Sequence, residues 1–448
     1  MARGEKIASS KVTILSKEKQ PFPVPENWFW TDIDSINQYS GLSIDPMKQP
    51  DTTFELYSVP SSADDYPEII TGSEIGSVKQ SVIKNDVLLC KINPRINRVW
   101  KISQYTDNEL MASSEWIIIR NSVINPDYLM FCFRTQYFRE FMLSNVSGVG
   151  GSLMRAQPKF VKKYPIPIAP ITEQQRIVDR IESLFAKLDE AKEKTQAVVD
   201  GFELRKSAIL HKAFTGELTE RWRKEHGVGL DSWKTKTSKE LFDYVTSGSR
   251  GWAQYYSETG AVFVRMGNLD HGTIELDFSD VQHVRLPDKA EGQRSRLQKN
   301  DILISITADV GMVGLVREMN FEAYINQHIA LARPNDENNS EFIAWYLVSD
   351  VGLRQMQGKQ RGATKVGLGL DDIRSLQLSM PKIAEQKEVV SILNELMNKE
   401  QQAKEAAEAV LSQIDAMKKA ILARAFRGEL GTNDPAEEWA GEMVKKSL

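Results

Sequence analysis

The sequence contains an internal repeat with a constant offset, and this repeat constrains the fold more than any other feature. Glu173-Gln174 recurs as Glu385-Gln386, and the run AFTGEL at 213–218 recurs as AFRGEL at 425–430. Both pairs lie 212 positions apart, so no residue has been inserted between the two anchors. Upstream, KNDVLL at 84–89 matches KNDILI at 299–304 with an offset of 215. The chain is therefore a tandem duplication in which two variable halves alternate with two segments of constant length.

The two constant-length segments have the pattern of long helices. Apolar residues recur in alternating steps of four and three, and no proline interrupts either segment. At about 1.5 Å per residue each helix can extend for about 60 Å, with Gly201 as the weak point of the first. The seam and partner-binding residues are predicted to be Ile177, Ile181, Leu184, Leu188, Val198 and Phe202, followed by Val389, Leu393, Leu396, Val410 and Ile414.

The order of the segments predicts how these helices pack. The first carries the chain away from one variable half and the second has to return, so we expect an antiparallel pair around a pseudo-two-fold axis. Several seam positions hold small or polar residues, which favours the docking of partner helices there. These positions are Ala191, Thr195, Glu400, Ala403 and Ala407. An ordinary helical hairpin is the alternative.

The predicted fold class is α+β, with two globular α/β domains joined by two long antiparallel coiled-coil helices. The expected boundaries are 1–170 for the first domain, 171–218 for the first spacer, 219–382 for the second domain, 383–430 for the second spacer and 431–448 for a C-terminal tail. Strands are expected at 86–90, 116–119, 262–265, 301–306 and 329–331. Helices are expected from Pro126 along the face of Leu129, Phe133, Tyr137 and Phe141, and over 341–351.

One loop of the first domain has the residues that read DNA bases. It follows a predicted strand and contains three basic residues and two carboxamides, with Pro94 to stiffen the turn. Arginine pairs with guanine through two hydrogen bonds, asparagine does so with adenine, and lysine binds phosphate. The candidate contacts are Lys91, Asn93, Arg95, Asn97 and Arg98. A solvated polar loop is the alternative.

A glycine-rich cluster occurs at equivalent places in both halves. Glycines allow a backbone to approach a phosphate closely, and basic residues flank both clusters. The candidates are Ser152, Arg155 and Lys159 in the first half and Lys359, Arg361, Thr364 and Lys365 in the second. Ser152 and Thr364 again differ by 212 positions. Either cluster alone is also typical of a simple turn.

A segment near the start of the second variable half mixes basic, amide and aromatic residues. Arg250, Gln254 and Tyr255 are candidates for DNA contact. The aromatic rings, including that of Trp252, are equally expected to cover the domain core.

Composition and missing motifs argue against catalysis. The chain has 57 basic and 61 acidic residues, so a DNA-binding surface has to be local. We find no phosphate-binding Gly-x-x-x-x-Gly-Lys-Ser/Thr run, no amino-methyltransferase motif and no nuclease carboxylate cluster. The two cysteines have no metal spacing, and the five histidines, among them His271, His283 and His328, are scattered. No metal or cofactor is expected in this chain, and the lack of a signal peptide or membrane span predicts a cytoplasmic protein.

Several longer runs resemble the specificity subunits of type I restriction-modification systems. They include LLCKINPRINRVW at 88–100, SNVSGVGGSLMRAQPKFV at 144–161, YPIPIAPITEQQRIV at 164–178, GSRGWAQYYSETGAVFVRMGNL at 248–269, INQHIALARP at 325–334 and GATKVGLGLDDI at 362–373. The resemblance covers nearly the whole chain. It implies two target-recognition domains, each reading one half of a split asymmetric DNA site.

The resemblance also implies partners that carry the chemistry. Two modification subunits would bind the helices, hold S-adenosylmethionine and methylate adenine, and restriction subunits would use ATP and Mg²⁺. A coiled-coil scaffold that binds proteins through its end domains is the rival reading. Two departures from the repeat stand out. Met380-Pro381-Lys382-Ile383 lacks a counterpart of Pro170, so the second helix could start differently, and the tail after Leu430 is expected to fold back toward the first domain.

Overall fold

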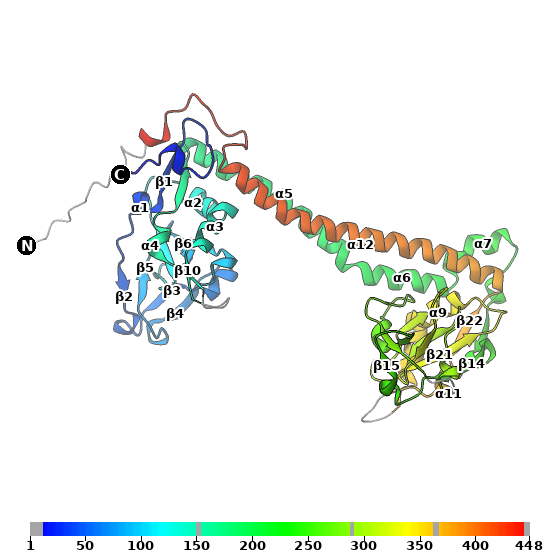
Figure 1. Cartoon of the computed structure of the whole chain (residues 1–448). Helices are drawn as coiled ribbons and strands as arrows, with labels where there is room; N and C mark the ends of the chain where they lie inside the picture. The colour runs from blue at the N-terminus through cyan, green and yellow to red at the C-terminus, as the bar shows by residue number, and fades with distance from the viewer. Residues whose placement is uncertain (1–11, 149–153, 287–290, 362–366, 443–448) are drawn as a thin grey trace, which may run out of the picture. The chain divides into compact units, whose positions relative to one another are not determined.

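The computed structural model describes residues 12–148, 154–286, 291–361 and 367–442. The chain forms two compact units, each of which combines one globular domain with parts of both long helices (Figure 1). The first unit consists of residues 1–195 and 409–448, and the second of residues 196–408.

Two small sheets build the first domain. The antiparallel sheet has the order β7-β6-β9, with bounds Val99–Lys101, Val87–Cys90 and Trp116–Ile119. The larger sheet has the order β2-β5-β8-β3-β4, with bounds Ser43–Ile44, Lys79–Ser81, Glu109–Ala112, Thr53–Tyr57 and Glu68–Thr71. In it β3 and β8 are parallel neighbours. A further antiparallel pair joins β1 (Phe29–Asp32) to β12 (Pro165–Ile168).

Two helices pack on the antiparallel sheet of this domain. They are α2 (Pro126–Phe133) and α3 (Gln136–Ser144), whose apolar residues share one core with β6, β7 and β9. Asn125 caps α2 because its Oδ1 accepts from the backbone of Asp127 and Tyr128. The single helical face expected through Phe141 is divided, because α2 ends at Phe133 and Thr135 caps the separate helix α3. Short helices α1 (Ile33–Ile36) and α4 (Pro158–Val161) and the hairpin β10 (Val146–Ser147) and β11 (Arg155–Ala156) complete the domain.

The second domain has a related set of sheets. One has the order β14-β21-β18-β19, with bounds Phe242–Ser247, Ile329–Pro334, Ile302–Ser305 and Val313–Leu315. The other has the order β15-β17-β16-β20, with bounds Tyr256–Ser257, Gln282–Val284, Ala261–Val264 and Ala323–Ile325. Here β16 and β20 are the parallel neighbours. Strands β13 (Lys234–Thr237) and β22 (Gln377–Met380) form the separate antiparallel pair.

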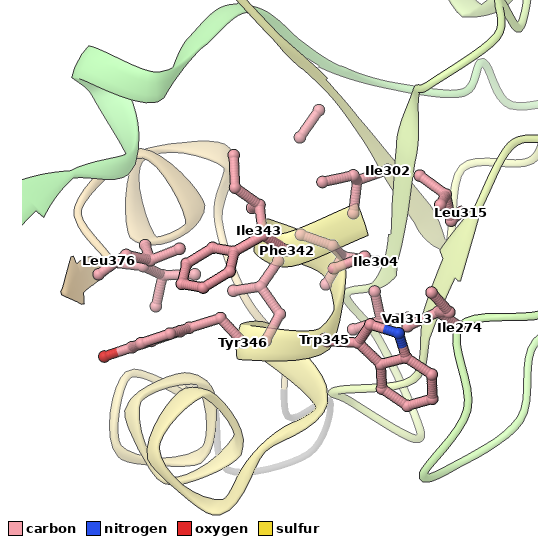
Figure 2. Close-up of a cluster of buried hydrophobic side chains, with 14 of the residues drawn as sticks. Ile274, Ile302, Ile304, Val313, Leu315, Phe342, Ile343, Trp345, Tyr346 and Leu376 are labelled. Carbon is pink, nitrogen blue, oxygen red and sulfur yellow. The ribbon is translucent and has the colours of Figure 1, made fainter. Parts of the chain in front are cut away.

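The core of the second domain lies between the antiparallel sheet and its helices. Figure 2 shows Ile302, Ile304, Val313 and Leu315 from the strands beside Phe342 and other residues of α9 (Ser340–Val348). The expected helix over 341–351 is also divided, since Ser349 ends α9 and caps α10 (Asp350–Gly358). The remaining helices of the domain are α8 (Ser238–Leu241) and α11 (Leu370–Arg374), and α7 (Glu220–Glu225) precedes it.

The repeated Lys-Asn-Asp motif has the same structure in both halves. Asn85 and Asn300 have φ values of 73° and 72°, a left-handed conformation that asparagine tolerates. Asp86 then accepts two hydrogen bonds from Arg120, and Asp301 accepts two from Arg333. The motif therefore fixes the start of β6 and β18 by a buried, two-pronged ion pair.

The constant-length segments form the long helices that the heptad pattern predicted. The first comprises α5 (Ile171–Asp200) and α6 (Phe202–Phe214), which meet at Gly201, and the second is the single helix α12 (Ile383–Ala425). A Cβ at Gly201 would lie 2.6 Å from the guanidinium of Arg205, so glycine makes room for that side chain. Within the described ranges, no helix is both long and apolar enough to cross a membrane.

The helices pack antiparallel within each unit (Figure 1). In the first unit Lys418 of α12 contacts Asp189 of α5 at 2.5 Å, and in the second Arg205 of α6 contacts Glu400 of α12 at 2.7 Å. The predicted seam residues differ in burial. Ile177, Ile181, Phe202, Val389, Leu393 and Ile414 are buried, Leu184, Leu188 and Leu396 are half-buried, and Val198 and Val410 are 40% and 41% exposed. Val198 and Val410 are therefore exposed seam positions whose neighbours Phe202 and Ile414 are buried.

The C-terminal tail folds against the first domain, as the sequence indicated. The Asn27 side chain donates to the Asp434 carbonyl at 3.0 Å, and Trp439 packs on Phe29. Arg176 of α5 forms a two-pronged ion pair with Glu437. Val12 and Ala440, near the two ends of the described residues, therefore both belong to the core of the first unit.

Candidate nucleic-acid interface

The basic loop after β6 contains a turn with two left-handed residues. Asn93 and Asn97 have φ values of 45° and 44° and flank a 3-10 turn at Pro94–Ile96. Asn97 donates its Nδ2 to the carbonyl of Phe133 at 3.2 Å, so this side chain is used to anchor the loop. The Oδ1 of Asn93 is buried without a hydrogen-bond partner. Backbone strain and an unpaired acceptor are features that concentrate at functional sites.

The basic side chains of this loop differ in exposure. Arg95 is exposed, and its carbonyl accepts from Arg139, which holds the backbone while leaving the guanidinium in solvent. Lys91 and Arg98 are half-buried. Arg95 is therefore the side chain of the loop with the freest reach toward a ligand.

The glycine-rich segment ends against the same loop. The Ala156 backbone donates to the Lys91 carbonyl at 2.8 Å, and Ile92 is bridged to Arg155. Arg155 contacts Glu115 at 3.2 Å, while Lys159 is exposed over the ring of Phe160. Ser152 lies outside the described residues. The structure thus brings Lys91 and Arg155, which belong to two separate motifs of the sequence, close together.

A third segment, the turn at 113–115 between β8 and β9, completes this end of the domain. The Lys91 backbone donates to the Glu115 carbonyl at 3.1 Å. One carboxylate oxygen of Glu115 meets Arg155, and the other is buried without a partner. Sequence reasoning missed Glu115 because a lone acidic residue in a turn gives no signal of base contact.

The second domain repeats this arrangement of three segments. The loop after β18 spans 306–312, and its Thr307 is bridged to Gly367 at the end of the second glycine-rich segment. The Leu368 backbone donates to the Ile306 carbonyl at 2.8 Å, and the Ile306 backbone donates to the His328 carbonyl at 2.9 Å. These bonds match those made by Ala156, Lys91 and Glu115 in the first domain.

The loop at 306–312 was not predicted as a candidate. It contains no lysine or arginine, and its strain is carried by Ala308, whose φ is 64°. Such a value is rare for alanine. The position of this loop could have identified it. Ile306 lies seven residues after Lys299 of the second Lys-Asn-Asp motif, as Lys91 lies seven residues after Lys84 of the first.

The candidates at the start of the second domain divide into surface and core. Ser249 is bridged to Asn326, which places the exposed Arg250 next to the turn at 326–328. Gln254 is exposed, whereas Tyr255 is half-buried against the small aromatic core. Trp252 stacks on Phe263 at 5.0 Å between ring centroids, so its ring covers the core.

The second glycine-rich segment is described only at its ends. Arg361 is exposed and donates to Asp372 at 3.0 Å, and Lys359 is half-buried at the end of α10. Thr364 and Lys365 lie outside the described residues. Arg361 is also bridged to Gly367, which connects it to the loop at 306–312.

Both domains therefore gather a hairpin loop with left-handed residues, a short turn and a glycine-rich segment at one end. This end carries polar side chains with hydrogen-bond donors and acceptors, with exposed arginines beside them. Among the described residues no group of three or more histidine, cysteine, aspartate or glutamate side chains could hold a metal ion. The arrangement is suited to recognition of a polar, anionic surface.

Comparison with known protein families identifies the class of protein that contains this duplicated arrangement. The family described as "Type I restriction modification DNA specificity domain" matches residues 47–199 and again residues 231–410, well over half of the chain. The chain belongs to this family. One specificity domain falls mainly in each unit, so the duplication read from the sequence is a duplication of the specificity domain.

Relatives of the family agree with this assignment. The EcoBI specificity subunit of Escherichia coli is 25% identical over 287 residues, which are 61% of this chain and 60% of that subunit. The EcoKI specificity subunit of Escherichia coli strain K12 is 24% identical over 328 residues, covering 70% of this chain and 69% of that subunit. The crystal structure of the HsdS subunit from Thermoanaerobacter tengcongensis covers 91% of this chain and 99% of that chain with a TM-score of 0.66 at 20% identity. The last similarity supports the fold.

Proposed function

We propose that this chain supplies the DNA sequence recognition of a type I restriction-modification complex and catalyses no reaction itself. Each specificity domain would read one half of a split, asymmetric site. The observation that carries the proposal is the shared backbone frame: the same three segments meet in both domains but present different side chains. Recognition of a DNA site with two different halves requires two similar domains that present different side chains to the bases.

The long helices would set the distance between the half-sites and bind the modification subunits. Support comes from the constant length of the two helical segments and from the exposure of Val198 and Val410 on the predicted seam. Apolar seam residues that stay exposed are suited to contact with further helices. Two modification subunits would bring S-adenosylmethionine and methylate adenine, and restriction subunits would bring the ATP- and Mg²⁺-dependent steps.

The candidate contacts fall into two groups by their surroundings. Exposed basic residues, namely Arg95, Arg155, Lys159, Arg250 and Arg361, would bind phosphate or guanine. Less exposed polar residues near them, namely Lys91, Asn93, Arg98, Tyr255 and Lys359, would complete the surface, together with the exposed Gln254. Asn97 would support the loop through its bond to Phe133.

Mapping of methylated bases tests the proposal directly. DNA from cells that express this chain with its modification subunits should carry methylated adenines within one split motif whose halves differ. The control is the same strain without this chain, in which the motif should be unmethylated. A continuous or palindromic motif, or methylation without sequence preference, would contradict the proposal and favour a protein-binding scaffold.

A further inference from the structure

A chain of three polar side chains runs through the turn at 326–328 of the second domain. The Thr307 Oγ1 lies 2.5 Å from the His328 Nδ1, and the His328 Nε2 lies 2.9 Å from the Gln327 Nε2. The turn itself is fixed by Asn326, whose buried Oδ1 accepts from the His328 backbone at 3.0 Å. Thr307, Gln327 and His328 are all half-buried, so they are ordered yet within reach of solvent.

The chemistry of the groups fixes the direction of these hydrogen bonds. A carboxamide nitrogen can only donate, so the His328 Nε2 accepts from Gln327. In a neutral ring the proton is then on Nδ1, and it is donated to the Thr307 hydroxyl oxygen. Gln327 is therefore held by one of its two N–H groups. Its second N–H and its Oε1 have no partner among the described residues.

The second N–H and the Oε1 of Gln327 are complementary to the hydrogen-bonding edge of one base. In the major groove adenine offers the N6 amino group as a donor and N7 as an acceptor, and a glutamine amide can satisfy both at once. We propose that Gln327 reads an adenine in the half-site bound by the second domain, with His328 and Thr307 as the residues that position its amide. This inference rests on the proposed function and names one of its base contacts.

The neighbours of Gln327 suit a position on DNA. The bridge between Ser249 and Asn326 brings the exposed Arg250 beside the turn. On the other side, Thr307 is bridged to Gly367, which is bridged in turn to Arg361. Basic side chains thus flank the turn on both sides, where phosphates of a bound duplex would be.

The equivalent turn of the first domain presents another chemistry on the same backbone. Trp116 donates to the Ser113 carbonyl as Ile329 donates to that of Asn326, so Glu115 takes the place of His328. Glu115 pairs with Arg155, whereas His328 pairs with Thr307. By the same register Ser114 takes the place of Gln327, so the side chain at the proposed reading position differs between the two domains.

The experiment is selection of bound sites from a DNA library by the full-length chain in complex with its modification subunits. For Gln327→Ala we expect the preference for adenine at one position of one half-site to fall at least about fivefold. His328→Ala and Thr307→Val should weaken the same position, and Thr307→Ser, which keeps the hydroxyl, should restore it. The control is His226→Ala, because His226 stacks on Trp222 of α7 away from the turn.

The other half-site serves as the internal measure of folding. If Gln327→Ala leaves every position unchanged, or weakens both half-sites equally, Gln327 does not read a base and the inference is overturned while the proposed function stands. If the unaltered complex selects no split motif, both the inference and the proposed function are overturned. Loss confined to one position of one half-site supports both.

Discussion

Gln174 and Gln386, 212 positions apart, make the same pair of hydrogen bonds, one buried and one partly buried. The Gln174 amide accepts from the Asn125 backbone at 2.9 Å and donates to the Ala169 carbonyl at 2.8 Å. The Gln386 amide accepts from Asn339 and donates to Pro381, both at 2.8 Å. Each glutamine joins the strand before its long helix to the cap of a domain helix. The lack of a second proline before α12 therefore does not change how that helix starts.

Loss of either glutamine should destabilise the unit that contains it. Gln174→Ala or Gln386→Ala leaves a partly buried backbone N–H and a buried carbonyl without their partner. We expect the free energy of unfolding to fall by about 2–4 kcal/mol. Urea titration followed by tryptophan fluorescence measures the change, with the exposed Lys387→Ala as control. Equal stability of Gln386→Ala and Lys387→Ala would contradict this account of the repeat.

The ion pair between Arg223 and Glu385 should contribute more than any exposed pair. Their closest atoms are 2.7 Å apart, and the side chains are 9% and 1% exposed. Arg223→Met leaves the Glu385 carboxylate buried with only the Thr219 hydroxyl, which should cost about 3–5 kcal/mol. Arg221→Met removes an exposed pair with Glu225 and should have no measurable effect. Thermal unfolding of the two variants compares them, and similar midpoints would refute the prediction.

The buried thiol of Cys132 should make stability depend on alkaline pH. Complete burial raises the pKa of Cys132 from 9.0 to about 12. Between these values the unfolded chain loses the proton while the folded chain keeps it, so the free energy of unfolding falls as pH rises. Cys132→Ala should show a shallower fall between pH 8.5 and 10.5, relative to its own stability at pH 7.5, in urea titrations at each pH. Parallel pH profiles for both proteins would count against this role of the thiol.

The fold follows from local signals that the sequence contains. The heptad pattern and the Glu-Gln repeat predict helices that the structure begins at Ile171 and Ile383, and Gly201 is where the first is interrupted. The periodicity could not predict that each expected domain helix is two shorter helices. Thr135 and Ser349 each cap a second helix through a side-chain bond, and a polar residue within an apolar face looks the same whether it caps a helix or lies within one.

The candidate site was predicted less completely, because side-chain charge was used as its marker. Arg95 and Arg155 were selected as candidates in this way, whereas the loop at 306–312, which has no lysine or arginine, and the turn with Gln327 were not. The positions of these segments depend on contacts between residues far apart in the sequence, such as that between Thr307 and His328. Charge and composition describe one segment of the sequence at a time. Thr307 and His328, in contrast, are brought together by the pairing of β18 with β21.

Arg95 should contribute to discrimination within the half-site read by the first domain. Its guanidinium is exposed while its backbone is held by Arg139, so the side chain can approach a base edge from a fixed support. Arg95→Ala should reduce the preference at one position by about 1–3 kcal/mol in competition binding, and Arg95→Lys should retain phosphate binding without two-pronged pairing. Lys48→Ala, on an exposed side chain, is the control. Unchanged discrimination in Arg95→Ala would remove this residue from the interface.

Paired insertions in the long helices test whether they set the spacing of the half-sites. Four residues added after Thr195 and four after Ala407, its counterpart 212 positions on, keep the antiparallel partners in step. The addition lengthens each helix by about 6 Å and turns it by about 40°. At 3.4 Å per base pair, the preferred spacer should grow by about two base pairs, or binding should be lost because the turn misaligns the reading surfaces. The same insertion at the exposed Gly227 should leave the spacer unchanged. Site selection with libraries of varied spacer distinguishes these results, and an unaltered spacer preference after the paired insertion would show that the helices do not determine it.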